Sequence, residues 1–167
     1  MLFPVPQGHS GSMNGAIGLL TRGALAGAAG TTALNAVSYA DMVLRARPAS
    51  GAPERTVSTL ADKAGVEIPG DGSQKQNRLA GLGPLSGIAV GIGVGVVVGA
   101  AAAAGARPPW WAQAPLAGLL AMAAADVPLA ALGISDPRTW SATDWISDAV
   151  PHLAYGLATT AALPAAP

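Results

Sequence analysis

The sequence predicts an all-α integral membrane protein, a four-helix transmembrane bundle with glycine-zipper packing. Hydrophobic residues make up 51% of the 167-residue chain and charged residues only 11%, whereas about a quarter of the residues in a soluble domain are charged. Residues 79–106 carry no charge and contain glycines at four-residue spacing, namely Gly83, Gly87, Gly91, Gly95 and Gly99. Helices in lipid associate by close backbone contact, which a row of small residues permits. This run therefore predicts a tightly packed membrane helix.

Four segments approach the roughly 20 apolar residues that a helix needs to cross about 30 Å of hydrocarbon. They are residues 16–40, 85–106, 112–134 and 145–163. The first is too long for the apolar region of a secretory signal, so we expect it to be retained. The spans belong to one transmembrane domain over residues 15–167. Residues 1–14, rich in Pro, Gly and Ser, are expected to be a flexible tail or a remnant of cloning.

The polar loop 41–78, between the first two spans, holds six of the nine basic residues. Within it, Pro53 and Glu54 start a short amphipathic helix, which lies in the membrane interface or folds over its own loop. Residues 70–77 are expected to be flexible. The third loop contains Arg138 and the second Arg107, so the positive-inside rule places the first and third loops in the cytoplasm and both termini outside. Tryptophans at 110, 111, 140 and 145 fit the two aromatic belts.

Ionisable side chains inside a span are costly and therefore indicate function. Counting from the third loop at 1.5 Å per residue places Asp126 and His152 at about the same depth, with Asn35 at a comparable depth in the first span. Tyr155 follows His152 by three residues and shares its helix face. These four residues are predicted to form an intramembrane polar layer. Asp126 is either a structural hydrogen-bonding group or part of a proton or substrate pathway. Arg22 in the first span is expected to reach the interface.

The glycine row is interpreted as a packing surface, with a homo-oligomeric pore as the alternative. Gly23 and Gly27 in the first span, at the same four-residue spacing, offer a partner surface within the chain. The sequence therefore predicts close pairing of the first two spans.

The sequence lacks the motifs of several catalytic and ligand-binding classes. Cysteine is absent, which excludes disulfides, thiolate metal sites and thiol catalysis. The net charge is zero, and no basic face for nucleic acid is apparent. The chain has no Gly-x-Ser-x-Gly elbow, phosphate-binding loop or His-Glu-x-x-His motif. The other histidine, His9, lies in the tail, which argues against a histidine metal site. We expect no catalytic residue, metal or cofactor.

Several short motifs occur in the order found in a family of small bacterial inner-membrane proteins. They are the Pro- and Arg-containing loop 45–55, Pro108-Pro109-Trp110, Leu132-Gly133-Ile134, and a last span in which Trp145 and Asp148 precede Pro151-His152-Leu153 and Tyr155-Gly156. In these features the chain resembles the YagU-like family, whose function is uncharacterised. The resemblance implies residence in a bacterial inner membrane and a link to acid or envelope stress, and it implies no reaction.

The expected function is therefore that of a non-enzymatic multi-pass membrane protein, acting in envelope homeostasis or as an accessory subunit. The alternative is a proton-coupled transporter or small oligomeric channel that uses Asp126 and His152, because histidine titrates near pH 6 to 7. An enzyme acting on lipid-like substrates is a third hypothesis. The expected partners are the lipid bilayer and either further copies of the chain or a larger membrane complex.

Overall fold

The computed structural model describes residues 10–106 and 108–163, and this part of the chain folds into α-helices without strands. The helices are α1 (Ser10–Arg45), α2 (Ala52–Lys63), α3 (Gly72–Ala103), α4 (Trp110–Ala131) and α5 (Ala142–Ala162), with a short 3-10 turn at Pro137–Thr139. The predicted all-α class is confirmed. Residues 1–9 and Arg107 lie outside the described residues, so nothing tests the predicted tail there. Residues 10–14, which were assigned to the tail, belong to α1.

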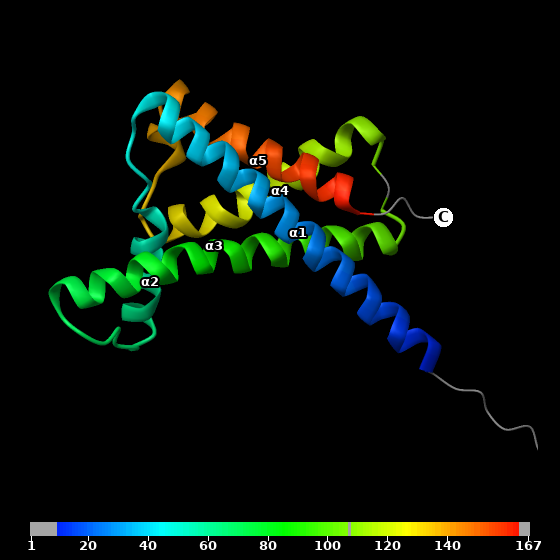
Figure 1. Cartoon of the computed structure of the whole chain (residues 1–167), viewed down its shortest axis with the longest axis horizontal. Helices are drawn as coiled ribbons and strands as arrows, with labels where there is room; N and C mark the ends of the chain where they lie inside the picture. The colour runs from blue at the N-terminus through cyan, green and yellow to red at the C-terminus, as the bar shows by residue number, and fades with distance from the viewer. Residues whose placement is uncertain (1–9, 107, 164–167) are drawn as a thin grey trace, which may run out of the picture.

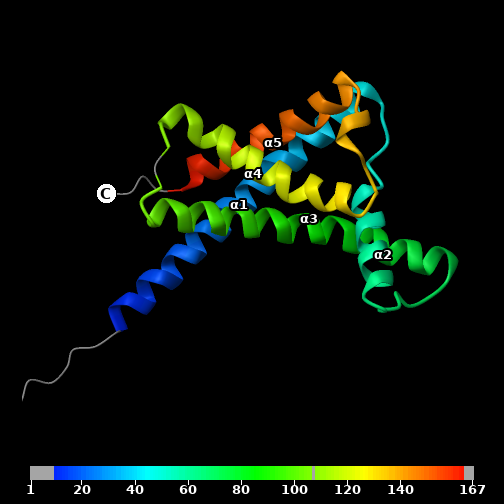
Figure 2. The same ribbon diagram turned by 180° about the vertical axis from the view of Figure 1, so that it is seen from behind.

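Four long helices run back and forth and form the body of the molecule, whereas α2 lies across one end of α3 (Figure 1). α1 packs along α3 and α5, and α4 packs mainly along α5. Seen from behind, the first turns of α1 extend away from the other helices (Figure 2). The centre of the bundle is a small cluster of Val94, Ala121 and Tyr155, to which Leu34, Val98 and Ala124 add partly buried side chains.

Two of the described helices, α3 and α4, are long and apolar enough to cross a membrane. Only 22% of the most apolar window of each is buried inside the chain, so most of their apolar side chains face outward. The other two long helices are less apolar. α1 contains Arg22 and Asn35, and α5 begins with a polar segment that includes Asp144 and Asp148.

The polar segment 41–78 differs from the prediction because it is mostly helical. α1 continues to Arg45, and α3 begins at Gly72 rather than at residue 85, so the expected flexibility of residues 70–77 is wrong from Gly72 onward. The first turns of α3 contain Gln, Lys and Arg, which are good helix formers. Gly70 supplies the left-handed turn before the helix, with φ 86°. Arg78 Nη1 donates to the Pro69 carbonyl at 2.8 Å and ties this turn to α3.

The predicted amphipathic helix is present as α2, with Pro in its first turn and Glu54 and Lys63 near its two ends. Its N-terminus contacts α3 because Gly83 has no side chain. A Cβ on Gly83 would lie 3.0 Å from the Glu54 nitrogen and 3.1 Å from Pro53 Cβ. α2 is therefore packed on its own chain at the end of α3.

Candidate functional site

Glycines form the contact between α1 and α3. A Cβ on Gly27 would lie 2.6 Å from the Gly91 carbonyl oxygen and 3.0 Å from the Gly95 Cα. A Cβ on Gly99 would lie 3.0 Å from the Gly23 Cα. Real Cβ atoms do not come so close to backbone atoms, so the two helices can approach this closely only with glycine at these positions. The structure thus brings Gly23 and Gly27 against the second half of the glycine row.

The first half of the row does not face α1. Successive residues of an α-helix turn by about 100°, so positions four apart drift by about 40° around the helix. Gly83 accordingly faces α2, and a Cβ on Gly87 would meet nothing within 4 Å. The row is therefore not one continuous face, and only Gly91, Gly95 and Gly99 pair with α1.

A second glycine contact, between α4 and α5, was missed in the sequence. A Cβ on Gly118 would lie 2.6 Å from the His152 carbonyl oxygen, and one on Gly156 would overlap the Ala114 carbonyl. The available signal was the spacing of Ala114 and Gly118, which is the same small-x-x-x-small pattern. This contact fixes the position of His152 relative to α4.

Tyr155 lies at the centre of the bundle, where α1, α3 and α5 meet. Its side chain is 1% exposed, and its hydroxyl donates to the Gly91 carbonyl at 2.6 Å. Gly30 leaves room for the ring, since a Cβ there would lie 2.8 Å from two of its carbons. The hydroxyl of Thr159, which is fully buried, lies against the same glycine. Tyr155 therefore links α5 to α3 by a buried hydrogen bond.

His152 is buried on α5, one turn before Tyr155 on the same face. Its Nδ1 lies 2.8 Å from the backbone carbonyl of Asp148 and 3.4 Å from the Asp148 carboxylate. A carbonyl oxygen only accepts hydrogen bonds, so Nδ1 carries a proton and Nε2 is the nitrogen left to bind another. The ring is thus held in one tautomer by its own helix.

Asp148 is the group that connects Asp126 to His152. The Asp126 carboxyl, half-buried on α4, interacts electrostatically with both of them. Asp148 Oδ2 is fully buried and has no hydrogen-bond partner within the described residues. Asp126 also interacts electrostatically with His152 directly. The structure thus adds Asp148 to the predicted pair of Asp126 and His152, whose equal depth in a membrane stays a prediction.

Asn35 is half-buried on α1, and its side chain has no hydrogen bond within the described part of the chain. α1 packs on α3 and α5 rather than along α4. The predicted place of Asn35 in one layer with Asp126 stays a prediction. Asp148 enters the sequence analysis only within the family resemblance, although its spacing of four from His152 places both on one face of a helix.

Two further sequence-based expectations concern a metal site and Arg22, and both can be compared with residues 10–106 and 108–163. No group of three or more His, Cys, Asp or Glu side chains is arranged to hold a metal ion there. Arg22 is exposed. Its interpretation as a side chain that reaches outward stays a prediction.

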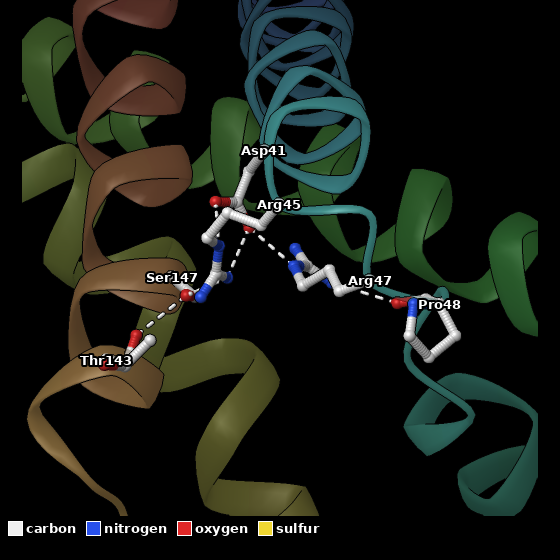
Figure 3. Close-up of polar contacts among 6 residues, drawn as sticks. All are labelled: Asp41, Arg45, Arg47, Pro48, Thr143 and Ser147. Atoms are coloured by element: carbon white, nitrogen blue, oxygen red, sulfur yellow. Dashed lines mark hydrogen bonds and ion pairs between the residues drawn. The ribbon is translucent and has the colours of Figure 1, made fainter.

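A second polar group joins the end of α1 to the start of α5 (Figure 3). Asp41 accepts two hydrogen bonds from Arg45, each 2.6 Å long, and one from Arg47 at 2.5 Å. Ala46, with φ 50°, turns the chain so that Arg47 returns to Asp41. Arg45 also donates to Ser147 Oγ at 2.6 Å, and Ser147 donates to its own helix. This group fastens the first loop to α5.

The two arginines hold the pKa of Asp41 at about 2, chiefly through the hydrogen bonds from Arg45 and Arg47. A carboxyl whose pKa is lower in the folded state contributes stability above its ordinary value of 3.8, and this contribution disappears as the pH falls through about 2. We expect Asp41→Asn to unfold more easily than wild type at pH 7, with the difference shrinking below pH 4. Chemical denaturation in micelles measures this difference.

Asp136→Asn is the matched control, because Asp136 pairs with Arg138, whose side chain is 89% exposed. Exposed ion pairs contribute little, so this substitution should have a smaller effect at pH 7. A pH-independent loss in Asp41→Asn would contradict the assignment of this stability to the ionised carboxylate.

Comparison of the chain with protein-family models, curated proteins and solved structures found no match. The resemblance to the YagU-like family accordingly stays a prediction.

Proposed function

We propose that the chain is a multi-pass inner-membrane protein whose α1, α3, α4 and α5 each cross the bilayer. α1 has 36 residues and α5 has 21, so at 1.5 Å per residue both reach about 30 Å. All four helices expose large apolar side chains, including Leu25, Val97, Leu119 and Leu157. A soluble protein rarely leaves so much apolar surface in water, whereas lipid accepts it.

The distribution of charged residues supports one orientation. The bond between Arg45 and Ser147 places the first loop at the same end of the bundle as the start of α5. The basic residues of the first and third loops therefore gather at this end, which favours a cytoplasmic location for it. Trp110 and Trp111 at the start of α4 are 83% and 65% exposed, as expected of side chains at the opposite interface.

Within the membrane we propose a non-enzymatic role in envelope homeostasis or as an accessory subunit. The observation that carries this proposal is that the glycines at the helix crossings contact other helices of the same chain, whereas Gly87 is left open. The glycines in contact are Gly23, Gly27, Gly91, Gly95, Gly99, Gly118 and Gly156. A glycine zipper that lines a pore between copies would leave its glycines free for a neighbouring chain. The chain therefore resembles a self-contained bundle, whose outward apolar side chains are left for lipid or for a larger complex.

Proton-coupled transport is the second candidate, and a different observation favours it. Two carboxyl groups, Asp126 and Asp148, interact beside His152, and Asp148 Oδ2 has no hydrogen-bond partner in the part of the chain that the structure describes. Carboxyl and imidazole side chains that lie together inside a span are the groups from which proton relays are built. We propose that protons pass from Asp126 through Asp148 to His152.

Proton flux into liposomes separates the two candidates. The purified protein is reconstituted with an internal pH dye, and flux under an imposed gradient is compared for wild type, Asp126→Asn and Asp148→Asn. Transport predicts flux that falls by about tenfold or more in both variants, while Asp136→Asn, outside the bundle, keeps it. The accessory role predicts no flux above that of empty liposomes. A variant that loses its helical circular dichroism would show that the carboxyl is structural.

A further inference from the structure

A groove with a volume of about 480 Å³ lies between the loop that follows α2 and the first half of α3. This loop returns along the start of α3 at the basic end of the bundle (Figure 1). Val66, Ile68, Leu82 and Leu85 supply most of the apolar lining, and Gly81 leaves space between them. Val66 and Leu85 are 59% and 60% exposed. The groove thus presents apolar side chains that the chain itself does not cover.

The groove changes from polar to apolar along α3. Arg78, Leu82 and Leu85 are spaced by four and three residues, so they lie on one face of the helix. Leu85 is the first residue of the predicted second span, which places the apolar part of the groove at the hydrocarbon boundary and Arg78 outside it. A groove with this orientation matches the polarity of a phospholipid, whose charged headgroup lies outward of its acyl chains.

The charged side chains of the lining have opposite signs and are not paired with each other. Arg78 uses one N–H to bind the Pro69 carbonyl at 2.8 Å, and a guanidinium has five N–H donors. Glu67 lines the same groove. No ion pair joins Glu67 to Arg78 in the described part of the chain, and neither side chain has a further hydrogen bond there. One free anion and one partly free cation therefore face the same space.

We propose that this groove binds a phospholipid with a phosphoethanolamine headgroup. Arg78 donates to the phosphate, Glu67 accepts from the primary ammonium, and an acyl chain lies against Leu82 and Leu85. Charge-assisted hydrogen bonds of these two kinds are the strong ones, and arginine suits phosphate especially well. The inference rests on the proposed membrane location and adds a lipid class to it.

The two charges also define which lipids bind less tightly. A phosphocholine headgroup has a quaternary ammonium, which cannot donate a hydrogen bond to Glu67. A phosphoglycerol headgroup has no cation, so it leaves Glu67 next to a net negative lipid. Phosphatidylethanolamine is therefore expected to bind more tightly than both other lipids. Each of them lacks the charge-assisted hydrogen bond to Glu67, which should lower its affinity about tenfold.

Native mass spectrometry of the full chain tests this preference. Protein in detergent is titrated separately with phosphatidylethanolamine, phosphatidylcholine and phosphatidylglycerol, and the fraction carrying one lipid is measured. Arg78→Gln should weaken binding of all three lipids by about tenfold. Glu67→Gln should weaken only phosphatidylethanolamine and remove its preference. Lys63→Gln is the matched control, because this basic residue on α2 does not line the groove.

The outcomes separate this inference from the membrane assignment. Flotation with liposomes after an alkaline wash first shows whether the protein is inserted. An inserted protein that binds the three lipids equally, or whose preference survives Glu67→Gln, overturns the lipid site and leaves the membrane assignment intact. A protein that the alkaline wash removes from liposomes contradicts both. Tighter binding of phosphatidylglycerol would overturn the role of Glu67. Self-association through the groove in place of lipid binding would also overturn the proposal.

Discussion

Gly95→Ala is expected to destabilise the protein by about 2 to 3 kcal/mol, because overpacking of a close contact has a cost of this size. A Cβ on Gly95 would overlap backbone atoms of both Gly27 and Gly23. Backbone atoms cannot move aside as the end of a flexible side chain can, so α1 and α3 must separate. Unfolding by a strong detergent in mixed micelles, followed by circular dichroism, measures the loss.

Gly93→Ala is the matched control for this substitution. Gly93 lies two residues away on the same helix, and a Cβ there would meet nothing within 4 Å. Alanine favours a helix over glycine by up to about 1 kcal/mol, so this variant should be as stable as wild type or more stable. Equal effects at positions 93 and 95 would show that the measured change reflects helix propensity rather than contact between α1 and α3.

Tyr155→Ala is expected to have the largest effect of any single side-chain truncation, about 3 to 5 kcal/mol. The ring is 1% exposed and belongs to the cluster with Val94 and Ala121 at the centre of the bundle. Its removal leaves a cavity between α1, α3 and α5 and also deletes the bond to the Gly91 carbonyl. The same unfolding titration measures this effect.

Two further variants separate packing from hydrogen bonding at this position. Tyr155→Phe keeps the ring and removes the hydroxyl, so it should cost only about 1 kcal/mol or less. Tyr39→Ala removes the other tyrosine, which is 57% exposed, and should change stability little. A loss in Tyr155→Phe as large as that in Tyr155→Ala would mean that the bond to Gly91, rather than the ring, holds the helices together.

The four long helices could be predicted from the sequence because their signal is local. A long uncharged run such as residues 79–106, with polar residues on either side of it, can be recognised as a helix from the neighbouring residues in the chain alone. The partner of Gly91, Gly95 and Gly99 was also within reach, since Gly23 and Gly27 repeat their spacing. The helical start of α3 could not be predicted in this way, because Gly70 and Gly72 suggested flexibility. The hydrogen bond from Arg78 to Pro69 that ties down this segment joins residues nine apart in the sequence.

The carboxyl pair could not be predicted from depth alone. Counting residues from a loop assumes that the two helices begin at one level and lie straight side by side. In the structure Gly118 contacts the His152 backbone, and the Asp126 carboxyl interacts with both Asp148 and His152. Which residues of two antiparallel helices face each other depends on the side-chain volumes at their crossing point. The position of that point cannot be determined from a single sequence.

The apolar character of the helices and the glycine contacts between them indicate different numbers of membrane crossings. Among the described residues, α3 and α4 alone have the length and apolar character of spans. A bundle in which only these two helices cross would keep α1 and α5 on one side. The glycine contacts argue against that arrangement, because α1 lies along α3 with backbone atoms nearly touching. α5 is joined to α4 in the same way. Helices whose backbones meet this closely at their crossing points are expected to share the hydrocarbon layer.

Single-cysteine labelling from one side of the membrane tests the four-span arrangement most directly, since the natural chain has no cysteine. Ser50→Cys, Ala104→Cys, a cysteine appended after Pro167 and Ser10→Cys are each treated with an impermeant maleimide in intact cells. Four spans predict that Ala104→Cys and the two terminal cysteines are labelled together from outside, while Ser50→Cys is labelled only after permeabilisation. Labelling of either terminal cysteine together with Ser50→Cys would contradict four crossings.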